Sequence, residues 1–451
     1  MQNPKNTNLE SNASPVAGDE GTRLASRLQR PELLTRGAAG STPETGDLCM
    51  VDGMCEDRFA EVRREFERNF VERRELGASV CVMHEGRRVV DLWGGNSDEE
   101  DTVAWTADTM VVVFSCTKGA VALCVHMLAS AGELDLDLPL AYYWPEFCQH
   151  GKGLITVRMA LSHQAGLPGI NHPLAPGEIC DFEAMTQAIA DDHPLWRPGS
   201  RHGYHAMTFG WILGELIRRV STQTVGSFFR RHVAEPLGID FWIGLPESED
   251  HRVATTVMAP AGSFGVRDRF DRALAERQPI QLANLHSLGD LLDPGVCDSP
   301  IIRSAEIPAG NGIASARALA GMYAPLSMDG ESDNTKLVGP AQILQMIATE
   351  SAGEDAVFLE PSRFSAGFEK APPGREAVTQ KRGLVISEPA FGHSGLGGAV
   401  GFADPDGRFS FGYVMNRHPE AGETVNRRYQ PLIDATYRSL GYRSCAGGKW
   451  I

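Results

Sequence analysis

Strand-like segments near both ends of the chain, separated by a long helical stretch, constrain the fold more than any other feature. Residues 78–95 (ASVCVMHEGRRVVDLWGG) predict two strands joined by a tight turn at Glu85-Gly86. Residues 383–389 (GLVISEP) predict another strand, and residues 395–416 (GLGGAVGFADPDGRFSFGYVMN) predict two more around a DPDG turn. The pattern therefore favours an α/β (α+β) fold: one antiparallel sheet built from both ends, flanked by helices, with a mostly helical lobe inserted.

Helical periodicity places the other elements. Residues 57–74 predict a helix with one apolar face made of Phe59, Val62, Phe66, Phe70 and Val71. Residues 115–132 predict a helix after the apolar run TMVVVF, and residues 155–169, 208–233 and 428–440 predict three more. We expect residues 1–52 to be a disordered or loosely packed tail. Residues 53–451 would form one domain, with a sheet lobe from 53–130 and 310–451 and a helical lobe from 131–309.

Composition excludes several functional classes. The 451 residues include 42 Lys+Arg and 58 Asp+Glu, a formal charge of −16, which disfavours nucleic acid and anionic membranes as partners. The chain has no run of 18 apolar residues that would predict a membrane span, and its polar start (MQNPKNTNLESN) does not resemble a secretion signal. The nine cysteines show no CxxC pair, so we expect reduced thiols in a cytoplasmic protein, with neither metal nor cofactor.

The clearest chemical motif is Ser115-Cys116-Thr117-Lys118. Of seven lysines, Lys118 alone has a serine three positions before it. The spacing puts both side chains on one face of the predicted helix, and a hydroxyl at a helix N-terminus lies where partial positive charge stabilises an anion. An N-cap serine with a solvated lysine is the alternative. The apolar residues that follow (AVALCV) favour a buried helix, and therefore a lysine that can accept the serine proton.

Two further segments could contribute to the same site as this motif. Tyr204 stands in a glycine-containing loop before an amphipathic helix, where it could reach a cleft or be an ordinary core-edge aromatic residue. Residues 392–398 (GHSGLGG) are dense in glycine at a strand edge, which exposes backbone N–H donors, or they form a simple turn. Exposed N–H groups are what a tetrahedral oxyanion needs.

The order S-x-x-K, Tyr204 and H-x-G resembles the serine β-lactamase/penicillin-binding-protein superfamily, and more narrowly the β-lactamase-like carboxylesterases (family VIII esterases). The resemblance covers about residues 55 to 440. It implies a β-lactamase/transpeptidase-like fold, Ser115 as nucleophile, and Lys118 and Tyr204 as the proton-handling pair. The N–H groups of Ser115 and Leu396 would form the oxyanion hole. The residues predicted to face the substrate are His393, Ser394, Gly395 and Leu396.

Two departures indicate the substrate class. Class C β-lactamases carry Tyr-x-Asn and Lys-Thr-Gly, whereas this chain has Ala206 and His393 at the Asn and Lys positions. We therefore expect a serine hydrolase for carboxylic esters of small to medium acyl groups. An acyltransferase of the same fold, or a D-amino-acid peptidase or weak β-lactamase, remains the alternative. A non-catalytic binding protein is disfavoured, since the serine, lysine and tyrosine are all present.

Ser263 is a second candidate nucleophile. Residues 261–265 (AGSFG) approach the G-x-S-x-G elbow of α/β-hydrolases, but the buried strand that the elbow requires does not precede Ser263. We therefore expect Ser263 to be dispensable. The expected partner is a small-molecule ester, with no nucleic acid and no membrane span, and a homo-oligomer remains open.

Overall fold

The computed structural model describes residues 51–100, 102–258, 268–332, 335–372, 383–420, 423–445 and 448–451. The predicted tail therefore lies outside the described residues up to residue 50, and so does Ser263. The described residues belong to one compact unit. The division of that unit into a sheet lobe and a helical lobe at residues 130 and 310 stays a prediction.

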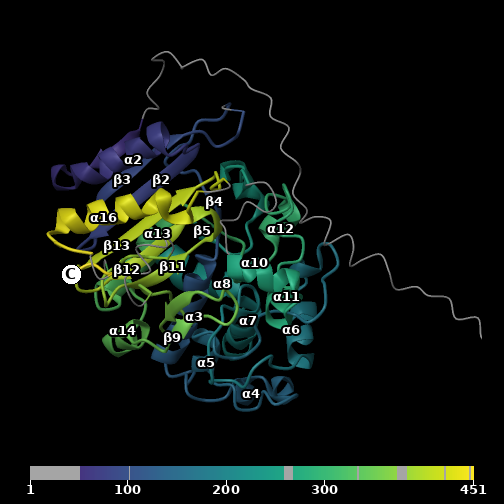
Figure 1. Ribbon diagram of the computed structural model, residues 1–451. Coiled ribbons are helices and arrows are strands. Elements are labelled where there is room, and N and C mark those ends of the chain that lie inside the picture. Colours follow the sequence, from purple (N-terminus) through teal and green to yellow (C-terminus); the bar gives the residue numbers. More distant parts are fainter. Residues whose placement is uncertain are drawn as a thin grey trace, which may run out of the picture. The chain divides into compact units, whose positions relative to one another are not determined.

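A six-stranded antiparallel sheet joins the two ends of the chain (Figure 1). Its strand order is β1-β3-β2-β13-β12-β11, and β2 pairs directly with β13, with Val80 opposite Tyr413. The predicted sheet built from both ends is therefore confirmed. The strands are β1 (Asp52–Cys55), β2 (Gly77–His84), β3 (Arg87–Gly95), β11 (Phe391–Ser394), β12 (Val400–Asp404) and β13 (Phe409–Met415).

The predicted hairpin turn is confirmed, whereas two strand assignments change. Glu85 and Gly86 have φ values of 50° and 75°, the left-handed conformations of a two-residue hairpin turn. Strand β1 was not predicted, and it begins inside the segment expected to be tail. Residues 383–389 form no strand, because the N–H and C=O groups of Val385 bond to the Gln430 side chain instead of to a neighbouring strand.

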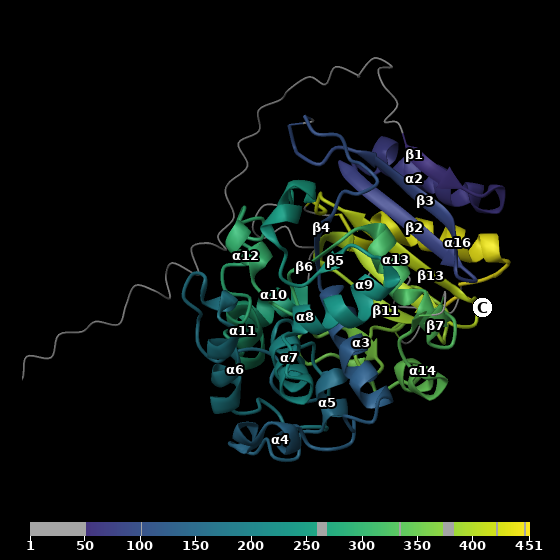
Figure 2. The same cartoon turned by 180° about the vertical axis from the view of Figure 1, so that it is seen from behind.

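Helices cover both faces of this sheet. Helices α2 (Ala60–Glu72) and α16 (Tyr429–Leu440) pack on one face, and α13 (Ala316–Tyr323) packs on the other (Figures 1 and 2). Close contact with α13 requires glycine at Gly412, where a Cβ atom would lie 2.2 Å from the Ala316 carbonyl oxygen. The predicted apolar face of α2 is partly wrong: Phe66 is buried but Val71 is 70% exposed. Five residues correspond to about 140° around a helix axis, which turns Val71 toward solvent.

The middle of the chain is mainly helical, as predicted, but two long helices are shorter than expected. The helix predicted for 155–169 ends at Leu161, before Gly166 and Pro168. The helix predicted for 208–233 is interrupted at Thr222, where φ is 60°. The helices are α3 (Thr117–Ser130), α4 (Leu140–Tyr143), α5 (Val157–Leu161), α6 (Phe182–Asp191), α7 (Thr208–Ser221), α8 (Val225–Phe229), α9 (Glu235–Leu237), α10 (Asp268–Ala275), α11 (Pro279–His286), α12 (Pro300–Ser304) and α14 (Pro340–Ile347).

Smaller sheets complete the architecture. A three-stranded sheet has the order β4-β6-β5, and two-stranded pairs are formed by β9 with β10 and by β7 with β8. The strand β4 leads directly into α3, so this small sheet positions the start of that helix. The strands are β4 (Val111–Phe114), β5 (Phe241–Trp242), β6 (Gly312–Ala314), β7 (Glu331–Ser332), β8 (Thr335–Lys336), β9 (Ser351–Glu354) and β10 (Pro361–Phe364).

Candidate active site

Ser115 lies in the sharp turn between the buried strand β4 and helix α3. Phe114, the residue before it, has φ of 45°, a left-handed conformation that costs a non-glycine residue about 1–3 kcal/mol. Thr117 holds this turn from two sides: its hydroxyl donates to the Phe114 carbonyl and accepts from the Gly312 N–H at 2.8 Å. The turn leaves Ser115 half-buried while its neighbours are buried, so the surrounding structure fixes the serine in a strained but defined place.

Lys118 is fully buried, because α3 is apolar on nearly all sides. Its Nζ atom donates to Ser115 Oγ at 3.1 Å and to the Ala309 carbonyl at 2.9 Å. Burial disfavours the ammonium form and lowers the pKa of Lys118 to about 7, although the nearby Glu369 carboxylate opposes this shift. A lysine in this state can accept a proton from a hydroxyl near neutral pH.

Tyr204 is buried in the loop before α7, close to Lys118. The Lys118 Nζ atom lies 4.9 Å from the centre of the Tyr204 ring. The Tyr204 N–H donates to both carboxylate oxygens of Asp355, each at 3.1 Å, and the Tyr204 carbonyl accepts from Asn284 Nδ2 at 3.3 Å. The ring stacks on Phe358, with 5.1 Å between ring centres. Main chain and ring are therefore both held.

Asp355 and His163 are positioning residues that sequence reasoning missed. Asp355 is fully buried and also accepts hydrogen bonds from the N–H groups of Val357 and Phe358. His163 has φ of 61°, and its carbonyl accepts from the Gly203 N–H at 3.0 Å. Together they clamp the tyrosine loop from two sides. No sequence signal distinguishes Asp355 from other acidic residues.

The imidazole of His163 acts as an acceptor in this clamp. Its Nδ1 atom accepts from the His205 N–H at 3.1 Å, and its ring lies 4.9 Å from the Tyr204 ring. Burial lowers the pKa of His163 well below its usual value and lowers the pKa of His205 to about 4. Both rings are therefore neutral at pH 7, which suits an acceptor nitrogen beside a lysine.

Strand β11 brings residues 393–395, the H-x-G of the resemblance and here called the third motif, to Ser115. The Cys116 thiol donates to the His393 carbonyl at 3.3 Å. A Cβ atom at Gly395 would lie 2.3 Å from the Val113 carbonyl oxygen, so only glycine allows this approach. Gly395 donates its N–H to Ala399 at 2.7 Å, and the chain then turns through Leu396–Gly398. The structure therefore brings the predicted motifs together at the start of α3.

Side-chain directions within the third motif differ from one residue to the next. The His393 ring is buried, donates from Nδ1 to the Ser394 carbonyl at 2.7 Å, and lies 6.1 Å from the Tyr204 ring. Burial lowers the pKa of His393 below its usual value. Ser394 bonds to Glu369, a carboxylate that the sequence analysis did not single out. The backbone N–H groups of Ser115 and Leu396 donate to no acceptor among the described residues.

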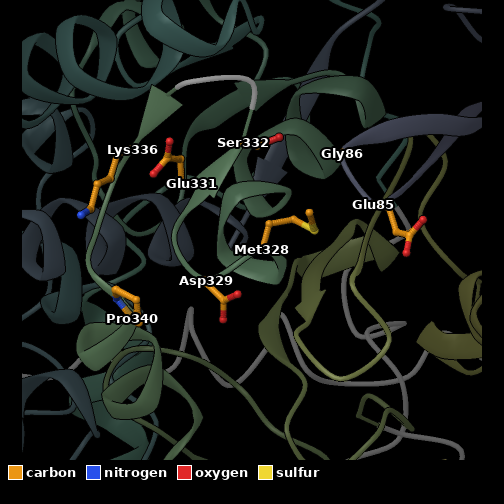
Figure 3. Close-up of a pocket in the computed structure, with 8 residues that line it drawn as sticks. All are labelled: Glu85, Gly86, Met328, Asp329, Glu331, Ser332, Lys336 and Pro340. Carbon is orange, nitrogen blue, oxygen red and sulfur yellow. The ribbon is translucent and has the colours of Figure 1, made fainter.

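Two surface hollows lie away from these residues. One, with a volume of about 470 Å³, is formed by the turn at Glu85 and Gly86 and by residues around β7, β8 and the start of α14. Figure 3 labels the residues that line it. A second, of about 610 Å³, lies beside the C-terminal end of α3. Neither is lined by Ser115, Tyr204 or the third motif.

Within the described ranges, no group of three or more His, Cys, Asp and Glu side chains has an arrangement suited to a metal ion. None of the helices in the same ranges combines the length and the apolar character that a bilayer crossing requires.

Comparisons with known proteins identify the family. Residues 63–435 match the Beta-lactamase family. A relative, Esterase/beta-lactamase LipL of Mycobacterium tuberculosis, is 34% identical over 377 residues, which cover 81% of this chain and 83% of the relative. The crystal structure of a family VIII carboxylesterase superposes with a TM-score of 0.76 at 34% identity, covering 86% of this chain and 100% of that chain. A penicillin-binding protein homolog from Caulobacter crescentus superposes with a TM-score of 0.74 at 38% identity, with the same coverage.

These matches confirm the predicted β-lactamase/transpeptidase-like fold and the predicted enzyme class, a β-lactamase-related hydrolase of the esterase type. The match extends over well more than half of the sequence and includes the segments that carry Ser115, Tyr204 and His393. The chain belongs to the Beta-lactamase family.

Proposed function

We propose that the protein hydrolyses carboxylic esters of small to medium acyl groups through a covalent acyl-enzyme on Ser115. The observation that carries this proposal is the hydrogen bond of 3.1 Å between Lys118 Nζ and Ser115 Oγ, made by a lysine whose burial disfavours the ammonium form. The esterase names of relatives that are 34% identical support the ester as substrate.

The proposed reaction has two steps. Ser115 Oγ attacks the ester carbonyl carbon while its proton passes to the Lys118 and Tyr204 pair. The carbon–oxygen bond to the alcohol then breaks, and the alcohol leaves with that proton. Water attacks the acyl-enzyme and loses a proton to the same pair. The bond between the acyl carbon and Ser115 Oγ then breaks, the acid leaves, and the pair returns the proton to Ser115 Oγ. The N–H groups of Ser115 and Leu396 would stabilise the oxyanion in both steps, and removing one such donor typically costs about 100- to 1000-fold in kcat.

The pH dependence of kcat/KM tests the role of Lys118. The base must be neutral, so activity should rise with pH through the Lys118 pKa of about 7. Burial lowers the pKa values of His163, His205 and His393 below the usual histidine value of about 6.5, so their titration lies on the acid side of this rise. The measurement is a pH profile with a neutral ester between pH 5 and 9. A rate that is flat across this range would contradict lysine as the base.

Substrate preference tests the ester assignment. We expect ready hydrolysis of p-nitrophenyl butyrate and little hydrolysis of benzylpenicillin. His393 replaces the lysine of β-lactamases, and its buried, neutral ring offers no ammonium to the penicillin carboxylate. A lost charge-assisted contact is worth about 1.5–3 kcal/mol, or roughly 10- to 100-fold. The measurement is kcat/KM for both substrates on one preparation, and comparable values would assign the enzyme to the β-lactamases.

We also propose a cytoplasmic location. The eight described cysteines are all free, including Cys148, which is exposed, and unpaired thiols are typical of a reducing compartment. Fractionation of cells that make the protein tests this location, and recovery from an extracytoplasmic fraction would contradict it.

A further inference from the structure

Glu369 lies along the outer edge of β11, the strand that carries the third motif. The opposite edge of β11 pairs with β12. On the outer edge, the Glu369 N–H donates to the Gly392 carbonyl at 2.8 Å, and the Gly392 N–H donates to the Glu369 carbonyl at 3.1 Å. The main chain of Glu369 therefore continues the sheet beside the motif, and its side chain is held close to that strand.

The Glu369 carboxylate accepts hydrogen bonds from both the backbone N–H and the hydroxyl of Ser394. Its Oε2 atom accepts from the Ser394 N–H at 2.9 Å and from the Ser394 hydroxyl at 2.7 Å. A hydroxyl has a single proton to donate. Because this proton is used by Glu369, Ser394 has only lone pairs to offer a substrate, and a substrate carboxylate would gain no hydrogen bond there.

The alternation of the strand puts this carboxylate next to the proposed oxyanion site. Successive N–H groups of an extended segment point to opposite edges. The N–H groups of Gly392 and Ser394 point outward to Glu369, while that of Gly395 points inward to Ala399. Gly395 is extended, so the next outward N–H along this edge is that of Leu396. A substrate carbonyl at Leu396 would therefore be a close neighbour of a negative charge.

The Glu369 carboxylate forms no salt bridge among the described residues, and its side-chain hydrogen bonds there come from the uncharged groups of Ser394. Lys118 is close enough to be influenced by it, but the pKa of about 7 leaves that ammonium only partly populated at neutral pH. Burial lowers the pKa of His393 and raises that of Cys116, so both are neutral. Glu369 also helps to raise the pKa values of Tyr323 and Tyr429, and both phenols are neutral.

We propose that Glu369 is a specificity-determining residue that makes the site select neutral or cationic esters over esters whose alcohol part carries a carboxylate. This inference rests on the proposed ester hydrolysis at Ser115. It gives the third motif a repulsive element in addition to the missing lysine, and selection against one class of ligand by like charge is a general means of achieving specificity.

The test compares esters of one size and different charge. The probes are para-acetoxybenzoate (anionic), para-acetoxybenzamide (neutral) and (para-acetoxyphenyl)trimethylammonium (cationic), each losing one acetyl group. The measurements are made at pH 8, above the pH range in which activity rises with deprotonation of Lys118. For the wild-type enzyme, kcat/KM should be lowest for the anionic ester. Glu369→Gln keeps an acceptor for Ser394 but removes the charge, and it should raise the anion-to-neutral ratio of kcat/KM roughly tenfold. The cation-to-neutral ratio should fall.

Three controls separate charge from structure. Glu72→Gln makes the same change in net charge on α2, at a half-exposed position across the sheet, and should leave both ratios unchanged. Ser394→Ala removes the hydroxyl but keeps the carboxylate, so it should not raise the anion ratio. Glu369→Met, which is uncharged and of similar length, replaces the glutamine variant if that variant does not fold.

The outcomes are distinguishable from failure of the proposed function. If the wild-type enzyme hydrolyses none of the three acetates, the proposed ester hydrolysis is wrong. If it hydrolyses them but Glu369→Gln leaves the ratios within twofold of wild type, the role of Glu369 is overturned. An equal rise in Ser394→Ala would also overturn it, since the hydrogen bond and not the charge would then set the preference.

Discussion

Replacing Ser115 with alanine is expected to abolish ester hydrolysis, lowering kcat by roughly 10⁴- to 10⁶-fold. The substitution removes only the hydroxyl oxygen, which accepts from Lys118 at 3.1 Å, and the turn around it is held by Thr117 and Gly312 instead. The variant should therefore fold, which circular dichroism can check. The measurements are turnover of p-nitrophenyl butyrate and labelling by a fluorophosphonate probe, which should both be lost.

Ser263→Ala serves as the control for this experiment. Because the sequence before Ser263 (MAPAG) does not predict the buried strand that a nucleophile elbow requires, this variant should keep most of its activity and its fluorophosphonate labelling. A folded Ser263 variant without activity, beside an active Ser115 variant, would reverse the assignment of the nucleophile.

Lys118→Arg is expected to reduce activity nearly as strongly as Lys118→Ala, by roughly 10²- to 10⁴-fold. Arginine stays protonated at every pH used in an assay, so it cannot accept the Ser115 proton. The arginine side chain is also bulkier than that of lysine, and the buried space around Lys118 Nζ is limited by the Ala309 carbonyl and the Tyr204 ring. The measurement is kcat/KM for a neutral ester at pH 8 for both variants.

Comparing Lys118→Arg with Lys118→Ala separates the positive charge of the lysine from its ability to accept a proton. If Lys118→Arg kept most of the rate while Lys118→Ala lost it, the lysine would serve only as a positive charge, and the base would have to be another group. Equal losses, together with disappearance of the acidic limb near pH 7, would assign proton acceptance to Lys118.

The candidate site could be predicted in part because some of its chemistry is local in sequence. Ser115 and Lys118 are three residues apart, so one helical turn brings them together whatever the rest of the chain does. The same logic predicted the hairpin turn at Glu85 and Gly86. In contrast, Tyr204 and His393 were found only because their order resembled a known family, and their catalytic roles stay predictions.

The remaining site residues could not be predicted because their signal is not local. Asp355 holds the Tyr204 main chain across 151 positions of sequence, and Glu369 meets Ser394 across 25. An isolated acidic residue in a sequence does not reveal which N–H groups it will accept from. The strand predicted for residues 383–389 was wrong because of a contact that is distant in sequence. Several of these residues are buried, as their apolar pattern indicates, but the Gln430 side chain makes the backbone hydrogen bonds of Val385 that a neighbouring strand would otherwise make.

The sequence by itself determined the order of the main elements: a strand pair near the start, an apolar helix after Ser115, helices through the middle, and strands with a glycine-dense edge near the end. These follow from local sterics and from periodic burial, which a single chain segment records. Only the tertiary structure decided the properties of the site. Burial around Lys118 weakens its ammonium form, and β11 places Glu369 beside Ser394. Both depend on desolvation and on contacts between segments distant in sequence, because a side chain's environment is created by packing and is not a property of its neighbours along the chain.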